Sequence, residues 1–492
     1  WQDGIKPSIL VESGADFLLY GMGERVIREA ARAMRNGYNA KLLRKIRQVA
    51  FLSDKNYVER LDPATTRHLA SYEECQSDKR AFGRNFVEVE TLSNMMESDV
   101  TLVEAVGDKY VVVTPPNATL STEELDHSFD LPYERAPHPR YRGKGDIPAW
   151  EMIKHSVNIH RGCFGGCSFC TISAHQGKFI VNRSEESILR EIKEIAKMDD
   201  FKGYLSDLGG PSANMYMMRG KNQELCAKCK RPSCAFPSVC KNMNTDHAPL
   251  LEMYRAVDAL PSIKKSFIGS GVRYDVVMHR TDSEEVNRTN AEYARELIKN
   301  HVSGRLKVAP EHTSDRVLSV MRKPSFSLFK QFKQTFDRIN DSEHLNQQII
   351  PYFISSHPGC EPIDMAELAI ETKRLNFQLE QVQDFTPTPM TLATEMYHTG
   401  VDPYTLKPIF VARTKDDKLA QRQFFFWYKP EERRTIKQFL QKIRRPDIAD
   451  RLFAGENNVG TRHAVSVDDT RNKPRHYEQE RKQFFDKKRR KK

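Results

Sequence analysis

The sequence predicts an α/β protein built around a parallel sheet or barrel. Between residues 153 and 385, apolar strand-like segments alternate with amphipathic helical segments, as expected of successive β/α units. The 492 residues are 29% charged and 39% hydrophobic, which is typical of a globular chain. We expect an N-terminal α/β domain with a linker (1–149), a core (150–385) with a cysteine-rich insertion (226–240), an irregular C-terminal extension (386–460) and a basic, unstructured tail (461–492).

The N-terminal region begins with an apolar run at residues 15–20, which suits a buried strand. A helix is predicted from Glu24 to near Gly37, and its apolar face is formed by Val26, Ile27, Ala30, Ala31 and Met34. A further short strand is expected at 110–113, and six prolines between 115 and 148 mark a linker. The chain starts at Trp1 and not at Met, so we expect this domain to be truncated at its start.

The core begins with a predicted strand at 157–159, followed by a cysteine-rich loop and a helix capped by Ser184. Further strands are expected at 203–206, 266–268, 305–308 and 349–354, with helices at 249–260, 286–299 and 328–339 between them. Pro351 is awkward within a central strand because it donates no ladder hydrogen bond.

Positive charge is concentrated in the tail. Residues 471–492 hold eleven Lys and Arg against three acidic residues, and they carry most of the net charge of +11. The aromatic run 424–428 is followed by Lys429, Arg433, Arg434 and Lys437, a mixture that single-strand binders also use. We favour a buried strand followed by a solvated helix for this run, and we keep weak, sequence-independent RNA contact through the tail as an alternative.

Seven of the nine cysteines lie between residues 163 and 240. Cys163, Cys167 and Cys170 form a C-x3-C-x2-C group directly after a predicted strand. Three thiolates can hold three irons of a [4Fe-4S] cluster and leave the fourth iron open. The alternative is zinc, with His160 or His175 as the fourth ligand. Cys75 and Cys360 stand apart and are expected to be small buried hydrophobic residues.

A second group places four thiols within fifteen residues. Its members are Cys226, Cys229, Cys234 and Cys240, and Lys228, Lys230, Arg231 and Lys241 surround them. Four soft ligands suit zinc or an auxiliary iron–sulfur cluster, and nearby cations favour the thiolate form. Unliganded packing is the third possibility, because the spacing matches no standard zinc knuckle.

The three-cysteine motif, with Phe169 before its last cysteine, resembles the signature of the radical S-adenosylmethionine (SAM) superfamily. The segments "DLGGPSANMY", "GSGVRYD", "LKVAPEHTSDRVLSVMRKP", "PYFISSHPGC" and "QDFTPTPMTLATEMYHTG" are similar to the YgiQ-type radical SAM proteins. Residues 15–34 resemble the same family and, more loosely, the Rossmann-like domain of cobalamin-dependent relatives. The chain has no Asp-x-His-x-x-Gly cobalamin-ligand pattern, which speaks against cobalamin.

The resemblance implies a partial (β/α)6 barrel of TIM type with the cluster at the carboxyl ends of its strands. It also implies SAM contacts from Phe169, from the backbone of Gly209 and Gly210, and from Ser270, Arg273 and Glu311. Pro211 stands where the superfamily's Gly-Gly-Glu element has its acid, so only the two glycines match. For Glu311, a helix N-cap region with Thr313 and Ser314 is an equal alternative.

We therefore expect a cytoplasmic enzyme that cleaves SAM reductively on a [4Fe-4S] cluster to form a 5′-deoxyadenosyl radical. Its electron donor would be a flavodoxin or ferredoxin, its substrate is not given by the sequence, and no membrane segment is expected. The rival hypothesis is a non-catalytic zinc- and RNA-binding protein with a basic tail.

Overall fold

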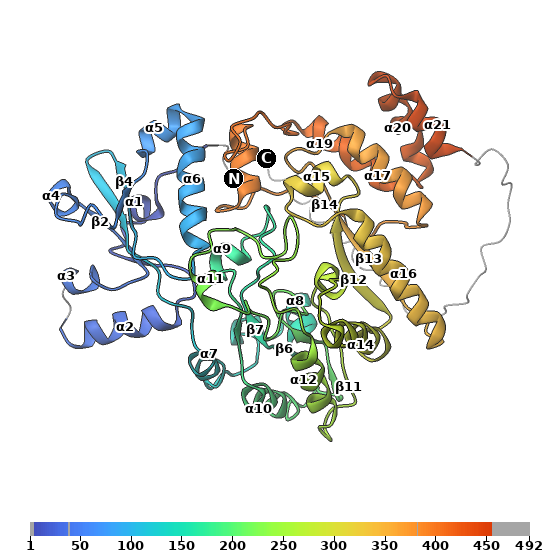
Figure 1. Cartoon of the computed structure of the whole chain (residues 1–492), viewed down its shortest axis with the longest axis horizontal. Coiled ribbons are helices and arrows are strands. Elements are labelled where there is room, and N and C mark those ends of the chain that lie inside the picture. The colour runs from blue at the N-terminus through green and yellow to red at the C-terminus, as the bar shows by residue number, and fades with distance from the viewer. Residues whose placement is uncertain (1–3, 38–39, 381, 455–492) are drawn as a thin grey trace.

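The computed structural model describes residues 4–37, 40–380 and 382–454. Figure 1 shows an N-terminal sheet at one end of the molecule, a mixed α/β core, and the last helices at the other end. Within the described ranges, no helix is long and apolar enough to cross a membrane.

The N-terminal sheet has the strand order β1-β2-β5-β4-β3. Its strands are β1 (Leu18–Leu19), β2 (Val49–Ser53), β3 (Thr66–His68), β4 (Thr101–Val106) and β5 (Lys109–Val113). Only β3 and β4 pair in parallel among these described strands. The expectation of a Rossmann-like domain, which has a parallel sheet, was therefore wrong. The Gly107-Asp108 turn joins β4 to β5 directly, and a hairpin of this kind can only be antiparallel.

The predicted helix after Glu24 is present as α2 (Glu24–Arg35). Val26 and Ala30 are buried, but Ile27 and Met34 are more than half exposed, so its apolar face is narrower than predicted. The other helices of this region and of the linker are α1 (Ile9–Ser13), α3 (Ala40–Leu43), α4 (Lys55–Val58), α5 (Tyr72–Ser77), α6 (Lys79–Ser93), α7 (Thr122–Phe129), η1 (Pro139–Tyr141) and α8 (Pro148–Ile153).

The core contains short parallel strands, as predicted. They are β6 (Ser156–Asn158), β9 (Tyr204–Leu205), β10 (Asp207–Gly209), β11 (Lys265–Ser266), β12 (Arg305–Glu311), β13 (Gln348–Ser355) and β14 (Val382–Asp384). β10 pairs with β6 and β9 with β11 in two separate two-stranded sheets, while β12, β13 and β14 form a three-stranded sheet. Pro351 lies opposite Val308 within β13, so the strand tolerates it.

Amphipathic helices cover these strands. Ser184 caps the first of them, since its hydroxyl oxygen accepts a hydrogen bond from the Ser187 amide at 3.1 Å. The helices of the core are α10 (Glu185–Ile195), α12 (Ala248–Asp258), α13 (Tyr274–Val277), α14 (Glu284–Asn300), α15 (Asp315–Val320), α16 (Phe326–Ser342) and α17 (Pro362–Arg374). Their apolar faces and the strands form one continuous hydrophobic core.

The C-terminal region is helical as far as Phe453, so the prediction of an irregular extension was wrong. Its elements are α18 (Leu392–Thr399), α19 (Lys415–Arg422), η2 (Gln423–Phe426), α20 (Pro430–Lys442) and α21 (Pro446–Phe453). Pro430 and Pro446 each occupy a first helical turn, where a proline costs no hydrogen bond. The run 424–428 is not a strand, but Phe424 and Phe425 are fully buried in the core, as expected.

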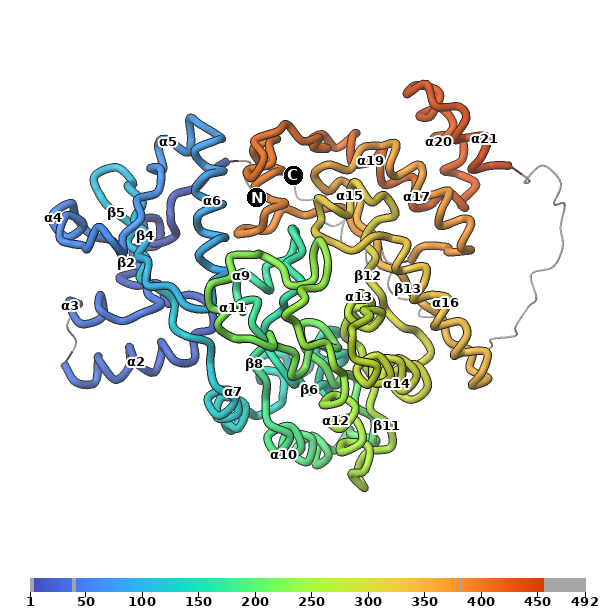
Figure 2. The backbone as a smooth tube through the Cα atoms, viewed as in Figure 1, coloured from blue at the N-terminus to red at the C-terminus, as the bar shows by residue number. Residues whose placement is uncertain are grey.

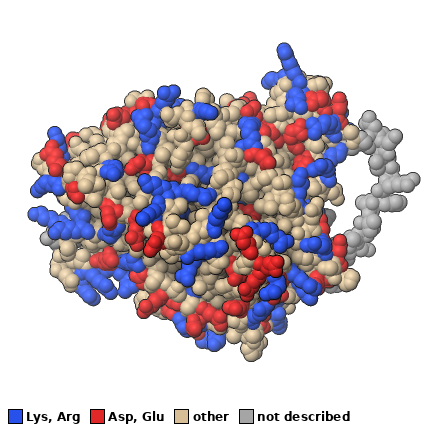
Figure 3. Space-filling model, viewed as in Figure 1, with Lys and Arg blue, Asp and Glu red and all other residues tan. Residues whose placement is uncertain are grey.

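Both signs of charge are interspersed on the face of the molecule drawn in Figure 3. The predicted basic tail lies outside the described residues.

Candidate functional site

The three-cysteine loop (residues 162–180) connects two short strands of the core. β7 (His160–Arg161) and β8 (Val181–Asn182) pair antiparallel and close the loop at its base, and α9 (Ile172–Gln176) lies within it. The Cys163 amide donates to the Gly177 carbonyl at 3.1 Å, and the Cys170 amide donates to the Cys167 carbonyl at 3.1 Å. Backbone hydrogen bonds therefore fix the positions of the cysteines.

Two glycines of this loop cannot be replaced without strain. Gly162 has φ +86° and Gly166 has φ +61°, a left-handed conformation that costs other residues about 1–2 kcal/mol. A Cβ on Gly162 would overlap the Phe179 carbonyl oxygen, and one on Gly166 would overlap the Pro232 carbonyl oxygen. The tight path of the loop thus depends on these two residues.

The three thiols lie close enough to influence one another. Burial raises the pKa of Cys170 to about 12, and the charges of Cys167 and Cys163 add to the rise. Burial also raises the pKa of Cys163, although the Arg273 guanidinium opposes the effect. Without a metal these two thiols are protonated at neutral pH, and a metal would have to displace the protons.

Three thiol side chains form the donor set of the loop. In the described part of the chain, no group of three or more His, Cys, Asp or Glu side chains is arranged to hold one metal ion. In a [4Fe-4S] cluster each thiolate binds a different iron, so the sulfurs do not converge on one point. His160, one of the two possible zinc ligands, is buried, and its Nε2 lies 2.9 Å from the Ser212 carbonyl oxygen.

The middle of the loop, at Ser168 and Phe169, contacts residues from the later part of the core and from α18. The Ser168 hydroxyl lies 3.2 Å from His357 Nε2, and the Phe169 ring meets the same imidazole edge-on at 5.9 Å. The Ser168 amide donates to the Met321 carbonyl, and the Ser168 carbonyl accepts from the Ala393 amide of α18. Phe169 is therefore packed beside the cysteines, where the sequence predicts a cofactor contact.

Gly209 and Gly210 end β10 beside the loop. A Cβ on Gly209 would lie 2.9 Å from the Ser270 hydroxyl, and one on Gly210 would lie 2.6 Å from His160 Nε2. Burial lowers the pKa of His160 to about 4, so its ring is neutral against Gly210. Only residues without side chains fit along this strand end.

Asp207 is a site residue that sequence reasoning missed. Its carboxylate accepts hydrogen bonds from the Gly269 amide at 2.9 Å, from the Ser270 amide at 3.1 Å and from the Ser270 hydroxyl. The Ser270 hydroxyl, which the sequence predicts as a SAM contact, is thus already paired. Asp207 directly precedes "LGG", and its place at a strand end was the available signal.

Four charged residues are buried beside the cysteines. The Arg273 guanidinium contacts Asp275 through Nε at 2.8 Å and through a second nitrogen, and its Nη1 lies 3.6 Å from Cys167 Sγ. Burial opposes ionisation of Asp275, but Arg273 outweighs it and holds the pKa of the carboxyl below its ordinary value. Lys323 Nζ lies 3.9 Å from Glu311 Oε1. Burial raises the pKa of Glu311, while Lys323 and Arg273 oppose the rise.

Three consecutive residues after α15 reach three parts of the molecule. The Met321 carbonyl accepts from the three-cysteine loop, Arg322 pairs with Glu90 of α6 at 2.7 Å, and Lys323 faces Glu311. Arg322 has φ +55°, which turns the chain sharply at this point. The N-terminal region is therefore joined to the core next to the cysteines.

The four-cysteine insertion (residues 220–243) packs directly on the three-cysteine loop, and this contact was not predicted. The Cys234 amide donates to the Phe164 carbonyl at 2.9 Å, and the Ser233 hydroxyl donates to the Gly165 carbonyl at 2.7 Å. Figure 2 shows α11 (Gln223–Ala227) of the insertion beside α9 of the loop. Burial raises the pKa of Cys234 to about 11; Lys178 opposes the rise, and the other three thiols of the insertion add to it.

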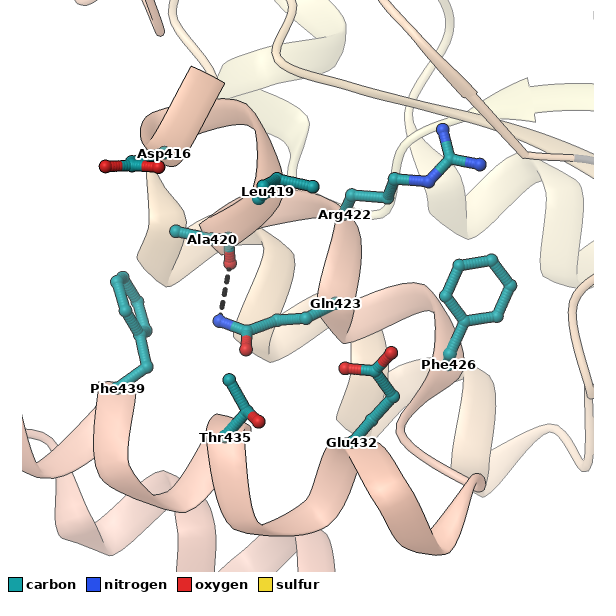
Figure 4. A pocket seen from close by; sticks show the side chains of 9 residues that line it. All are labelled: Asp416, Leu419, Ala420, Arg422, Gln423, Phe426, Glu432, Thr435 and Phe439. Carbon is teal, nitrogen blue, oxygen red and sulfur yellow. Dashed lines mark hydrogen bonds between the residues drawn. The ribbon is translucent and has the colours of Figure 1, made fainter. Parts of the chain in front are cut away.

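Cys75 and Cys360 are buried, as predicted. Cys360 Sγ lies 3.5 Å from His312 Nε2 and 3.3 Å from Gln421 Oε1. A cavity of about 400 Å³ lies between α19, η2 and α20. Figure 4 shows its lining side chains, with Phe426 and Phe439 on either side of Gln423. A second cavity of about 430 Å³ is lined by residues that include Thr313, which follows Glu311 closely in the sequence. Neither cavity is lined by a cysteine.

Two family models match parts of the chain. "Radical SAM N-terminal" matches residues 1–156, and a domain of unknown function, DUF3362, matches residues 380–477.

Among solved structures, this chain is similar to the radical SAM methyltransferase TsrM from Kitasatospora setae. The TsrM structure with tryptophan and a SAM analog bound is 14% identical in sequence, with a TM-score of 0.38. The alignment covers 79% of this chain and 54% of that one. With cobalamin and a [4Fe-4S] cluster bound, TsrM gives 13% identity and TM-score 0.40, covering 78% and 56%.

Curated relatives match along almost the whole chain. A UPF0313 protein of Bacteroides thetaiotaomicron is 60% identical over 93% of this chain and 75% of its own length. UPF0313 proteins of Porphyromonas gingivalis and Clostridium perfringens are 56% and 40% identical, over 97% and 96% of this chain and 75% and 71% of their own lengths. The chain belongs to the UPF0313 family, the YgiQ-type radical SAM proteins.

Proposed function

We propose that this protein is a radical SAM enzyme whose [4Fe-4S] cluster is held by Cys163, Cys167 and Cys170. The observation that carries the proposal is the folded C-x3-C-x2-C loop lying against a buried group of four charges. Family membership points to the same class of enzyme. When bound and reduced, the cluster would supply the electron that cleaves a C–S bond of SAM, giving methionine and a 5′-deoxyadenosyl radical.

The residues around the loop have chemistry that suits a zwitterionic ligand. Glu311 and Asp275 offer carboxylates for an amino group, while Arg273 and Lys323 offer cations for a carboxylate. All four are buried, so charges brought near them are screened weakly by water. Gly209 and Gly210 leave the end of β10 without side chains, which permits backbone contact. We assign SAM binding to these residues together with Phe169 and Ser270, whose hydroxyl oxygen can still accept a hydrogen bond while it donates to Asp207.

The parallel strands of the core support a partial (β/α)6 barrel as the scaffold. The loop and the segments that carry Gly210, Ser270 and Glu311 all follow carboxyl ends of these strands, the usual site of catalysis in barrels. The reaction also needs a one-electron donor, and we assign that part to a flavodoxin or ferredoxin in the cytoplasm. The substrate that loses a hydrogen atom is not specified by these residues.

Anaerobic reconstitution with iron and sulfide, followed by incubation with SAM and dithionite, tests the proposal. We expect 5′-deoxyadenosine and methionine in equal amounts, measured by mass spectrometry. The variant C163A/C167A/C170A should form neither product, and Cys75→Ala, which removes a buried cysteine far from the loop in sequence, should be fully active. Protein that holds iron but yields no 5′-deoxyadenosine, or that holds only zinc at the loop, would contradict the proposal.

A further inference from the structure

We propose that Cys226, Cys229, Cys234 and Cys240 bind a second iron–sulfur cluster, with thiolate ligands on all its protein-bound irons. This inference goes beyond the SAM chemistry proposed above and does not depend on it. It rests on the geometry of the four-cysteine insertion, on a buried lysine of the three-cysteine loop that reaches into it, and on the contact between the insertion and that loop.

The insertion is a closed loop with little regular structure of its own. Gly220 and Met243 form an isolated antiparallel bridge at its base, and Asn242 Nδ2 donates to the Asn222 carbonyl at 2.8 Å. Apart from α11, the residues between them form turns and bends. Segments of this size that lack a core of their own are commonly held by a bound metal or by disulfides, and its cysteines are free thiols.

Backbone hydrogen bonds link the four cysteines in two pairs. The Cys240 amide donates to the Cys234 carbonyl at 2.8 Å, and the Cys229 amide donates to the Cys226 carbonyl at 3.1 Å. The side-chain amide of Asn242 lies 3.3 Å from Cys226 Sγ and can donate to it. Amide donors aimed at sulfur stabilise thiolate ligands and tune the potential of iron–sulfur clusters.

Lys178 supplies the strongest evidence for bound thiolates. Its side chain is almost fully buried, with Nζ 2.7 Å from the Arg231 carbonyl and 3.8 Å from Cys229 Sγ. Among the residues described, no carboxylate pairs with this lysine at ion-pair distance. Buried charges require a counter-charge. Thiolates bound to a metal centre would provide that negative charge, whereas neutral thiols would not.

The spacing of the thiols favours a cluster over zinc. Tetrahedral zinc, with bonds of about 2.3 Å, would bring all four sulfurs to about 3.8 Å from one another. No such set of three or more ligands occurs in the described ranges, although all four thiols influence one another electrostatically. The described thiols of the three-cysteine loop likewise form no group that could hold a single ion. A centre in which the thiolates are shared among several irons does not require the four sulfurs to converge on one ion.

The second site would lie next to the first. One hydrogen bond, from the Cys234 amide to the Phe164 carbonyl, links a ligand of the second group to the neighbour of Cys163. Phe164, Cys163, Cys234 and Cys240 also share one hydrophobic cluster. The two centres therefore belong to a single structural unit.

The test measures iron, sulfide and zinc in the full-length C163A/C167A/C170A variant after anaerobic reconstitution. We expect about four irons per chain for a [4Fe-4S] cluster or about two for a [2Fe-2S] cluster, with matching sulfide. Adding C226A and C234A should remove this iron, while Cys75→Ala in the same background should not. One zinc per chain, or a folded triple variant that binds no iron, would overturn the inference.

A second measurement uses the unaltered protein and covers the case in which the variants misfold. Electron paramagnetic resonance of the reduced, reconstituted protein should show two cluster signals, only one of which changes when SAM is added, because a fully ligated cluster has no open iron. A single signal that SAM shifts completely would overturn the inference. Two signals that both ignore SAM would contradict the proposed SAM chemistry and leave the second cluster supported.

Discussion

The two cysteine groups touch each other but are held by different means. The three-cysteine loop is fixed by its glycines, by a strand pair at its base and by Met321 and Ala393 beyond its tip. The four-cysteine insertion is closed by one bridge, by the hydrogen bond from Asn242 to the Asn222 carbonyl and by backbone hydrogen bonds of its cysteines, and it has little regular structure. The fold thus shapes the loop, whereas the proposed cluster would add support to the insertion.

The cations of the two groups differ in the same way. Arg273, 3.6 Å from Cys167 Sγ, is neutralised by Asp275, whereas Lys178, 3.8 Å from Cys229 Sγ, has no acidic partner at ion-pair distance among the described residues. Arg273 therefore has its counter-charge within the fold. The counter-charge of Lys178 would come from the thiolates of the proposed second cluster.

The largest effect should come from removing one ligand at each site. Cys167→Ala should lower 5′-deoxyadenosine formation at least about 100-fold, since the cluster that supplies the electron is lost. Cys229→Ala should reduce the iron content but retain the SAM-sensitive signal of the first cluster. Product assays and iron analysis on both variants check this. Equal loss of the SAM-sensitive signal in both would show that the two groups form one site.

The cations give the next largest effect. Arg273→Met leaves Asp275 buried without its partner, and the free energy of unfolding of the metal-free protein should fall by about 3–5 kcal/mol. R273M/D275L should recover most of this loss. Lys178→Met should leave the metal-free protein equally stable or more stable, because no carboxylate is abandoned. Urea denaturation of the unaltered protein and of the three variants measures this difference between the two cations. A K178M variant that is destabilised as much as R273M would contradict it.

The free energies of unfolding of these variants must be compared at one pH, because the stability of the protein also depends on the protonation of Glu395 in α18. Burial raises the pKa of its carboxyl to about 8. The folded protein therefore keeps a proton that the unfolded chain has already released, and stability falls as pH rises toward 8. Between pH 6 and pH 9 the loss should be about 3 kcal/mol, and Glu395→Gln should abolish it. Urea midpoints at the two pH values measure it; parallel curves for both proteins would refute the assignment.

The smallest effect tests the contact between the groups. Gly14, at φ +68° with open space around it, and Gly166, at φ +61° against the Pro232 carbonyl, share a backbone conformation and differ in surroundings. Gly14→Ala should cost about 1 kcal/mol of unfolding free energy from conformation alone. Gly166→Ala should cost at least about 1 kcal/mol more, because the insertion must move. Equal costs would mean that the insertion does not press on the loop.

Local signals in the sequence were read well. The cap at Ser184, helix α2 and the parallel strands of the core follow from periodicity and capping, which are properties of neighbouring residues. The antiparallel N-terminal sheet was missed because pairing between distant strands leaves no mark on either strand alone. Of the C-terminal helices, the sequence indicated only the solvated helix after the aromatic run, which is α20. The others were missed because they are short, so that tertiary packing of residues such as Leu452 decides their form.

The candidate site divides in the same way. Cysteine spacing identified both groups, and chain order located Gly209, Ser270, Arg273 and Glu311 at strand ends. Nothing in the sequence near Lys178 indicates that it lies beside Cys229, some fifty residues later, or that Asp207 occupies the Ser270 hydroxyl. Such contacts form only in the folded chain, between residues that are far apart in the sequence.

The turn at Arg322 bears on how this protein can be divided. A fragment beginning at residue 150 would retain all seven clustered cysteines, yet it would lose Glu90, the partly buried carboxylate that pairs with Arg322. The unpaired guanidinium would then bind water or another partner at this bend. The same bend positions Lys323 beside Glu311 and the Met321 carbonyl beside the Ser168 amide of the loop. The shortest active piece of the chain is therefore expected to begin ahead of α6, well before Cys163.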